Sequence, residues 1–414
     1  MVAQPGTVQS AKSTAHGGAA GGRLLALDGL RGLTVLLMLL VNNIALQAAT
    51  PDQLMHAPFG GVTLADLVFP WFLFCMGVAI PRTASSPEGQ KLPRWHRVRR
   101  ILTRTALMFG LGLFLTSALA RTPVFALGVL QLIALAYCAA ALIYLASPRP
   151  AFLCGAAALL LVGYWAAIRL VPVPGVGPGV FEEGRNLLLH INRAFLEPLG
   201  LRGLPSVVPT AALALLGAVV GQLLQGATRR QRGTGQEQAL GPSESRGSRT
   251  AGAPSFPPPP YPFLSRHRPL PQLLLLGIGL TLLGHLWSLE LPFSKTFWTP
   301  PYIVLTAGLG TLVIGVFYAL FDLRGWRWAA FPLLVLGSNA LLAYVLPILF
   351  KVWVLQGWTV RVGGQRLSLQ QAWLNGHIAH AGVVLGGWAY TLLYTLLWWA
   401  VLWWFYRRKV FLRV

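Results

Sequence analysis

The sequence predicts an all-α membrane protein, a polytopic bundle of about ten spanning helices with both termini in the cytoplasm. Of the 414 residues, 55% are hydrophobic and only 11% are charged, whereas soluble proteins carry about 25% charged residues. The apolar residues form runs of about 20, the length that crosses a hydrocarbon core about 30 Å thick. They do not alternate with polar residues as the strands of a membrane β-barrel do.

The apolar runs divide the chain into a six-helix half, residues 23–225, and a four-helix half, residues 272–414. Residues 1–22 are mostly small or polar and are predicted to be a disordered cytoplasmic tail without a cleavable signal peptide. Residues 226–271 are rich in Arg, Gly, Ser and Pro and are predicted to be a flexible cytoplasmic linker. The predicted spans are 29–48, 63–81, 101–120, 124–146, 151–171, 207–225, 272–290, 301–321, 329–350 and 383–406.

The basic residues predict the orientation of the bundle. The formal net charge is +22, and the Lys and Arg residues lie between the apolar runs. Placing the N-terminus in the cytoplasm puts about two thirds of them on the cytoplasmic side, as the positive-inside rule requires. Charges placed in this way favour contact with membrane lipids and argue against a nucleic-acid partner.

Recognisable metal and hydrolase motifs are absent from the sequence. The three cysteines lie inside apolar runs and have neither disulfide nor metal-ligand spacing: Cys75, Cys138 and Cys154. A nucleotide-binding P-loop, a GxSxG elbow and an HExxH helix are also missing. We therefore expect no metal cofactor.

Asp28 and Arg31 lie at the cytoplasmic entry of the first predicted helix. Residues three apart share a helix face, so this Arg could grip a phosphate arriving from the cytoplasm. The alternative is structural, with Asp28 capping the helix and Arg31 anchoring it to headgroups.

Asn42, His56 and Asp66 lie near the outer ends of the first two helices. A carboxylate ten residues after a histidine is a natural partner that fixes the imidazole tautomer and stabilises the imidazolium. The structural alternatives are a helix terminator for Asn42, a solvated loop residue for His56 and a Thr63–Asp66 capping box.

Several further polar residues lie singly in or beside later apolar runs: Gln131, His285, Glu290, Lys295, Trp298 and Asn339. Unpaired polar groups are costly in hydrocarbon, so these side chains are expected to face the bundle interior. Hydrogen bonding between helices is the default interpretation for each of them.

The order of these motifs carries a family resemblance. Its most specific part is residues 56–77, HAPFGGVTLADLVFPWFLFCMG, and weaker parts lie at 23–32, 41–42, 128–131, 186–196, 204–207, 295–299 and 339–344. Together they cover residues 23–412 apart from the linker. They resemble the catalytic domain of the heparan-α-glucosaminide N-acetyltransferase family and its bacterial members.

The resemblance implies an acyl-CoA-dependent transmembrane N-acetyltransferase. Such an enzyme moves an acetyl group from cytoplasmic acetyl-CoA to an amino sugar or glycan acceptor outside, here in a bacterial inner membrane. His56 matches the family's essential histidine and Asn42 its helix-end asparagine. His56 is then interpreted as a general base or a transiently acylated nucleophile, Asp66 as its orienting partner and Asn42 as a donor to the oxyanion.

The resemblance also implies a donor-binding set and a homodimer. The candidate residues for acetyl-CoA are Asp28, Arg31, Gln131, Lys295, Trp298 and Asn339. The basic stretch 97–104 is a further candidate for the phosphates of the donor.

The acceptor is left open by three departures from the family pattern. Leu132 replaces an Arg, Asn192 replaces an Asp, and residues 201–203 replace an acidic approach to the sixth helix. Competing interpretations are a polysaccharide O-acyltransferase, whose opening motif is similar, a transporter or flippase of a glycan intermediate, and a non-catalytic membrane scaffold. A transporter would more naturally have paired broken helices in corresponding halves.

Overall fold

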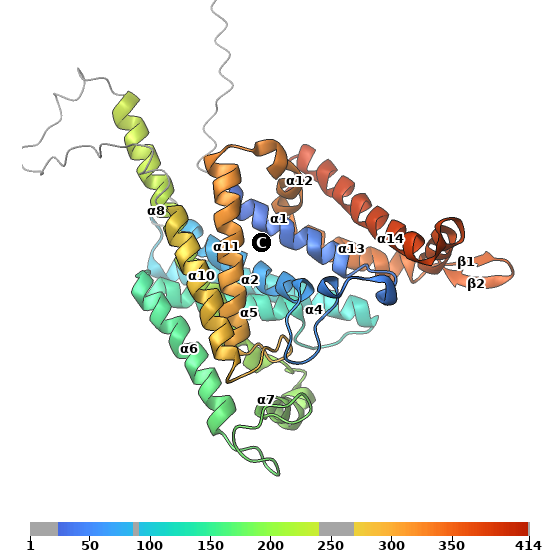
Figure 1. The fold of residues 1–414 in the computed structure, drawn as a ribbon, viewed down its shortest axis with the longest axis horizontal. Helices are drawn as coiled ribbons and strands as arrows, with labels where there is room; N and C mark the ends of the chain where they lie inside the picture. Colours follow the sequence, from blue (N-terminus) through green and yellow to red (C-terminus); the bar gives the residue numbers. More distant parts are fainter. Residues whose placement is uncertain (1–23, 86–90, 240–268, 413–414) are drawn as a thin grey trace, which may run out of the picture.

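The computed structural model describes residues 24–85, 91–239 and 269–412, and in these ranges the chain is a bundle of long helices (Figure 1). Within the described residues, eight helices are long and apolar enough to cross a membrane, and a bent pair makes a ninth. The first helix, with 17 residues, is slightly shorter than these. The predicted polytopic, all-α fold is therefore confirmed. The predicted tail 1–22 and most of the predicted linker lie outside the described residues.

The helices follow the predicted order. The longer ones are α1 (Leu25–Val41), α2 (Leu64–Ala84), α4 (Arg94–Ala120), α5 (Val129–Ala146), α6 (Pro150–Leu170), α8 (Val207–Ala239), α10 (Pro269–Ser288), α11 (Pro300–Phe317), α12 (Arg327–Ser338), α13 (Ala340–Phe350) and α14 (Leu369–Arg407). The shorter elements are α7 (Leu187–Ile191), the 3-10 turns Gln47–Ala49, Asp52–Leu54, Glu197–Leu199 and Leu204–Ser206, the π-helical turns Asn192–Leu196, Tyr318–Leu323 and Lys351–Leu355, and the antiparallel strands β1 (Thr359–Val362) and β2 (Gln365–Ser368).

Helix ends and breaks differ from the prediction in several places. The first helix stops at Val41, seven residues before the expected end, and α8 continues into the expected linker as far as Ala239. The expected ninth span consists of α12 and α13, bent by 66°. The expected tenth span is the second part of α14, which is broken at Gly382 with φ 78°. Helix boundaries depend on caps and tertiary contacts, which an apolar run does not reveal.

The β1–β2 hairpin was not predicted. It projects at the end of the bundle next to α14 (Figure 1). Its strands flank Gly363 and Gly364, both with positive φ. A two-glycine turn between β-prone residues is a typical hairpin signal, so the sequence did contain this information.

Three helices, α2, α8 and α11, form the most buried part of the bundle. α2 and α8 approach so closely that a Cβ on Gly77 would lie 2.1 Å from the Ala214 carbonyl oxygen, and one on Gly217 would lie 2.5 Å from the Phe74 oxygen. Small residues at helix contacts allow such close packing in membranes. The outer helices α4, α6 and α10 instead carry exposed apolar side chains such as Leu159 and Leu275, as lipid-facing helices do.

α1 is held in the same way against α12. A Cβ on Gly32 would lie 1.9 Å from the Leu333 carbonyl oxygen. The start of α1 is capped from a distant segment, because Asp322 accepts hydrogen bonds from the backbone N–H groups of Leu25 and Ala26 at 3.1 and 2.8 Å. These contacts fix the position of α1, whose C-cap residue is Asn42.

We expect Gly32→Ala to destabilise the protein. The added methyl group overlaps a backbone oxygen that cannot rotate away, and overpacking of this kind costs about 1–3 kcal/mol. The matched control is Gly279→Ala on α10, where a Cβ meets nothing within 4 Å. In detergent, the apparent Tm should fall for Gly32→Ala and stay level or rise for Gly279→Ala. Equal Tm values for the two variants would contradict the close α1–α12 contact.

Candidate active site

The loop that carries His56 is folded onto the start of α2. Thr63 and Asp66 form a capping box there, as expected from their spacing. The Thr63 hydroxyl donates to the Met55 carbonyl at 2.6 Å, which brings the neighbouring residue, His56, over the first turn of the helix. Asp66 therefore takes part both in the helix cap and in a polar pair with His56.

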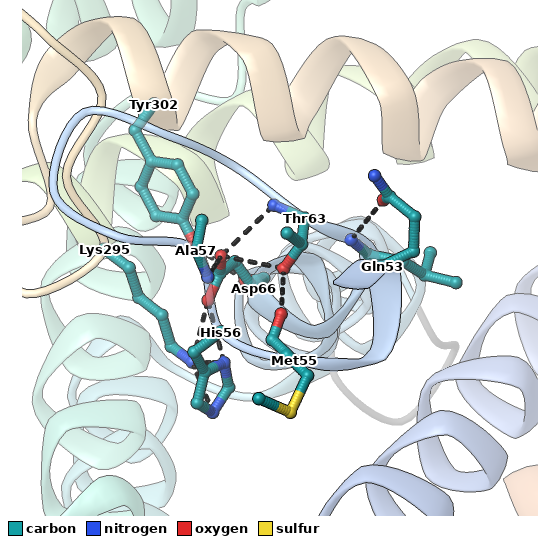
Figure 2. A network of polar contacts seen from close by, with 9 residues as sticks. Gln53, Met55, His56, Ala57, Thr63, Asp66, Lys295 and Tyr302 are labelled. Carbon is teal, nitrogen blue, oxygen red and sulfur yellow. Dashed lines mark hydrogen bonds and ion pairs between the residues drawn. The ribbon is translucent and has the colours of Figure 1, made fainter. Parts of the chain in front are cut away.

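His56 and Asp66 form the pair that the sequence suggested (Figure 2). Nδ1 of His56 lies 2.9 Å from Oδ1 of Asp66, and the side chains are 57% and 4% exposed, respectively. The other carboxylate oxygen, Oδ2, accepts from the N–H groups of Ala57 and Thr63 at 3.0 and 3.2 Å. An ionised carboxylate only accepts hydrogen bonds, so Nδ1 carries the proton and Nε2 presents its lone pair.

Lys295 completes the cluster from the loop between α10 and α11 (Figure 2). Its Nζ lies 3.0 Å from Nδ1 and 3.3 Å from Nε2 of His56, and 3.3 Å from Oδ1 of Asp66. Burial lowers the pKa of the Lys295 amine below its ordinary value, and the nearby Asp66 carboxylate opposes this shift only in part. A residue predicted to bind the donor thus lies directly against the candidate catalytic pair.

Tyr302 and Trp298 lie beside the His56–Asp66–Lys295 cluster. The Tyr302 hydroxyl donates to the Asp66 carbonyl oxygen at 2.6 Å. Trp298 has a positive φ of 51° and packs edge-on against Phe69, with 5.0 Å between ring centroids. The sequence indicated Trp298 but missed Tyr302. The signal in the sequence was a tyrosine inside an apolar run, because the hydroxyl of a buried tyrosine needs a hydrogen-bond partner.

Two cavities meet at His56 and Lys295. One, of about 220 Å³, is mostly apolar and extends between α1, α2 and α5 as far as Thr34, and Asn42 also lines it. The other, of about 480 Å³, is bordered by the His56 loop and the loop before α11. The predicted outer group, Asn42, His56 and Asp66, is therefore gathered around this junction.

Asn42 caps the end of α1, and its backbone oxygen accepts from Lys351 Nζ at 2.8 Å. Both residues also line a third cavity of about 390 Å³, which shares Met38 and Tyr344 with the apolar cavity. Lys351 was not among the predicted site residues, although it is the only charged residue in the apolar run 328–357. A cation at a helix C-terminus stabilises the last carbonyl groups.

Asp28 and Arg31, the pair predicted at the start of the first helix, lie within two turns of Thr34 on α1. Arg31 Nη1 is 3.4 Å from Asp28 Oδ1, and the two side chains are 27% and 11% exposed. The Thr34 hydroxyl donates to the Arg31 carbonyl at 2.7 Å. The Asp28–Arg31 pair and the lining of the apolar cavity therefore lie in succession along α1.

Two predicted donor-site residues have their amide groups engaged elsewhere. Gln131 is buried, and its Nε2 donates to Thr116 and to the Ala126 carbonyl, joining α5 to the end of α4. Asn339 donates to the Val410 carbonyl and accepts from the Leu412 N–H, which holds the C-terminal segment at the α12–α13 bend. Neither residue lines the cavities at His56, and in this structure both make structural hydrogen bonds.

The fold and this cluster define a multi-pass membrane protein with a His–Asp–Lys site at the junction of two cavities. A family profile described as a domain of unknown function (DUF5009) matches residues 23–147. The chain is similar to heparan-alpha-glucosaminide N-acetyltransferase of Homo sapiens, with 22% identity over 383 residues, 78% of this chain and 52% of the relative. The enzyme of the same name from Mus musculus is 22% identical over 384 residues, 78% of this chain and 53% of the relative.

The resemblance inferred from the motifs is thus confirmed as distant homology: the chain is a distant relative of the heparan-alpha-glucosaminide N-acetyltransferases. It spans about half the length of the curated relatives it matches. The DUF5009 match contains His56, Asn42 and Asp66, while Lys295 lies beyond it.

Proposed function

We propose that the protein is a membrane acyltransferase that moves an acetyl group from cytoplasmic acetyl-CoA to an amino sugar at the outer face of a bacterial cytoplasmic membrane. The observation that carries the proposal is the position of His56, whose Nε2 lone pair lies where an apolar cavity and a more polar one meet, 3.3 Å from Lys295 Nζ. This arrangement suits an acyl transfer across a membrane, because the two substrates of such a reaction arrive from opposite sides. The distant homology to acetyltransferases supports the same reaction class.

The donor would lie along α1. From Arg31 to Asn42 the helix rises about 16 Å, at about 1.5 Å per residue, a distance that an extended pantetheine arm can cover. Arg31 would meet the phosphates at the inner end. The thioester would reach His56 through the apolar cavity lined by Thr34 and Met38.

The acceptor would bind in the cavity of about 480 Å³. Its amine nitrogen attacks the thioester carbonyl carbon, so that an N–C bond forms, the C–S bond breaks and coenzyme A leaves as the thiolate. Nε2 of His56 takes the proton that the amine loses and returns it to the thiolate sulfur. Asp66, ionised throughout, stabilises the imidazolium formed between these steps.

Two groups could stabilise the negative charge on the carbonyl oxygen in the transition state. Asn42 lines the apolar cavity, and Lys295 lines both cavities. Preorganised donors at such positions are usually a large part of acyl-transfer catalysis. We assign this role to both side chains.

Labelled acetyl-CoA distinguishes the proposal from its competitors. Purified protein in lipid vesicles should transfer label to glucosamine in a time-dependent reaction and release free thiol in equal amount. Labelling of hydroxyl acceptors alone would point to an O-acyltransferase. Transport of a lipid-linked glycan without any label transfer would overturn the proposal in favour of a flippase.

The role of Lys295 predicts an alkaline limit to the reaction. Burial lowers the pKa of Lys295. The ammonium ion is present below that pKa and is lost as the pH rises through it, at a lower pH than for an ordinary lysine with a pKa of about 10.4. We expect kcat to fall at alkaline pH in the wild type and this fall to move to higher pH in Lys295→Arg, because a guanidinium stays charged. Exposed Lys91 provides the control Lys91→Arg, with an unchanged profile. Identical alkaline limbs in all three proteins would remove Lys295 from the mechanism.

A further inference from the structure

A carboxylate that the mechanism does not use borders the outer cavity. Four titratable side chains line this cavity of about 480 Å³: His56, Asp66, Lys295 and Glu183. Most of the remaining wall is aromatic or glycine, with Phe59, Phe69, Phe293 and Trp298 beside Gly60 and Gly61. Such a wall offers flat apolar faces to a small ring and only a few polar groups to orient it.

Glu183 stands apart from the other charges at this cavity. The Asp66 carboxylate is fully engaged by His56, Lys295 and two backbone N–H groups. Glu182, next to Glu183, pairs with Arg185 at 2.9 Å. Glu183 is exposed and lies at the border of the cavity, and across the described part of the chain no ion pair to it is found.

The position of Glu183 is set by a small hairpin. Glu182 and Arg185 exchange backbone hydrogen bonds at 3.0 and 3.3 Å, which leaves Glu183 and Gly184 at the turn. Phe181 anchors the turn by packing against Phe59 and Phe297, with ring centroids 5.5 and 5.7 Å away. Phe59 belongs to the His56 loop, so the turn is tied directly to the site.

We propose that Glu183 forms an ammonium-binding subsite that selects amine over hydroxyl acceptors. This inference rests on the proposed function. A primary amine near pH 7 is largely protonated when its pKa resembles that of an α-amino group, about 7.7–8.0. The Glu183 carboxylate attracts this cation, whereas a hydroxyl in the same place gains no ionic interaction. The ammonium group first releases one proton to the solvent that enters this open cavity. The neutral amine then attacks the thioester, and His56 takes the second proton, as in the proposed function.

The test compares two neighbouring carboxylates. Glu183 is exposed, so Glu183→Gln should raise the Kd of glucosamine about three- to fivefold, as expected for an ion pair in contact with solvent, and should raise KM in proportion. Glu182→Gln removes the same charge next door but outside the subsite, and should change either value less than twofold. Glucose, which carries a hydroxyl in place of the amine, should compete with the same Ki in wild type and Glu183→Gln.

Direct binding keeps this inference separate from the catalytic proposal. Glucosamine affinity is measured by calorimetry on the full chain in detergent without acetyl-CoA. Equal Kd values for wild type and Glu183→Gln, or equal losses in Glu182→Gln and Glu183→Gln, would overturn the subsite even if acetyl transfer is observed. A selective loss in Glu183→Gln together with no acetyl transfer would retain the subsite and overturn the acyltransferase.

Discussion

Replacing His56 by alanine is expected to lower kcat for acetyl transfer by at least about 10²- to 10⁴-fold, the range usual for loss of a general base. The effect should be large because no second base takes over. Asp66 is buried and its oxygens are engaged, while Lys295 is a cation in the functional state. The measurement is the initial rate of label transfer from acetyl-CoA to glucosamine at saturating concentrations.

Exposed His380 provides the matched control, because His380→Ala removes an imidazole outside the cluster and should leave kcat unchanged. A His56→Ala rate within about threefold of wild type would remove His56 from the chemistry. The same preparations separate the two roles of the histidine. Label retained on wild-type protein incubated without acceptor, and absent from His56→Ala, would indicate an acyl-histidine intermediate instead of direct transfer.

The His56–Asp66 pair could be predicted because the information is local. The two residues are ten apart, and the Thr63 cap that closes the loop between them is itself a recognisable motif. The ten apolar runs were equally direct evidence for the fold, since length and hydropathy alone identify a spanning helix. In both cases a short stretch of chain determines the structure.

Contacts between distant segments were harder to predict. Lys295 lies 239 residues from His56 in sequence, so nothing local placed its ammonium beside the imidazole. Asn339 is a second case: a buried polar residue in an apolar run predicted a place in the donor site, and in this structure its amide donates to the carbonyl of Val410, 71 residues away. A buried polar side chain must have a partner, and the sequence does not reveal which one.

Asp66→Asn is expected to lower kcat nearly as much as His56→Ala, although the Asp66 carboxylate exchanges no proton with the substrates. The N–H groups of Ala57 and Thr63 both point at Oδ2, so an asparagine would keep its carbonyl oxygen there and turn its NH₂ group toward His56. Nδ1 would then have to accept, which moves the imidazole proton to Nε2, the atom that must act as the base. For a comparable wrong-tautomer change in a Ser–His–Asp enzyme the loss in kcat is about 10⁴-fold.

The matched control is Asp52→Asn, an exposed carboxyl in the same loop, which should leave kcat within about twofold of wild type. If the pair acts as a unit, the double variant His56→Ala/Asp66→Asn should be no slower than His56→Ala alone, because the second change has nothing left to disturb. The Tm separates this from the capping role. A large fall in Tm with kcat retained in the folded fraction would make Asp66 only a helix cap, whereas lost kcat with KM and Tm nearly unchanged is the result that tautomer control requires.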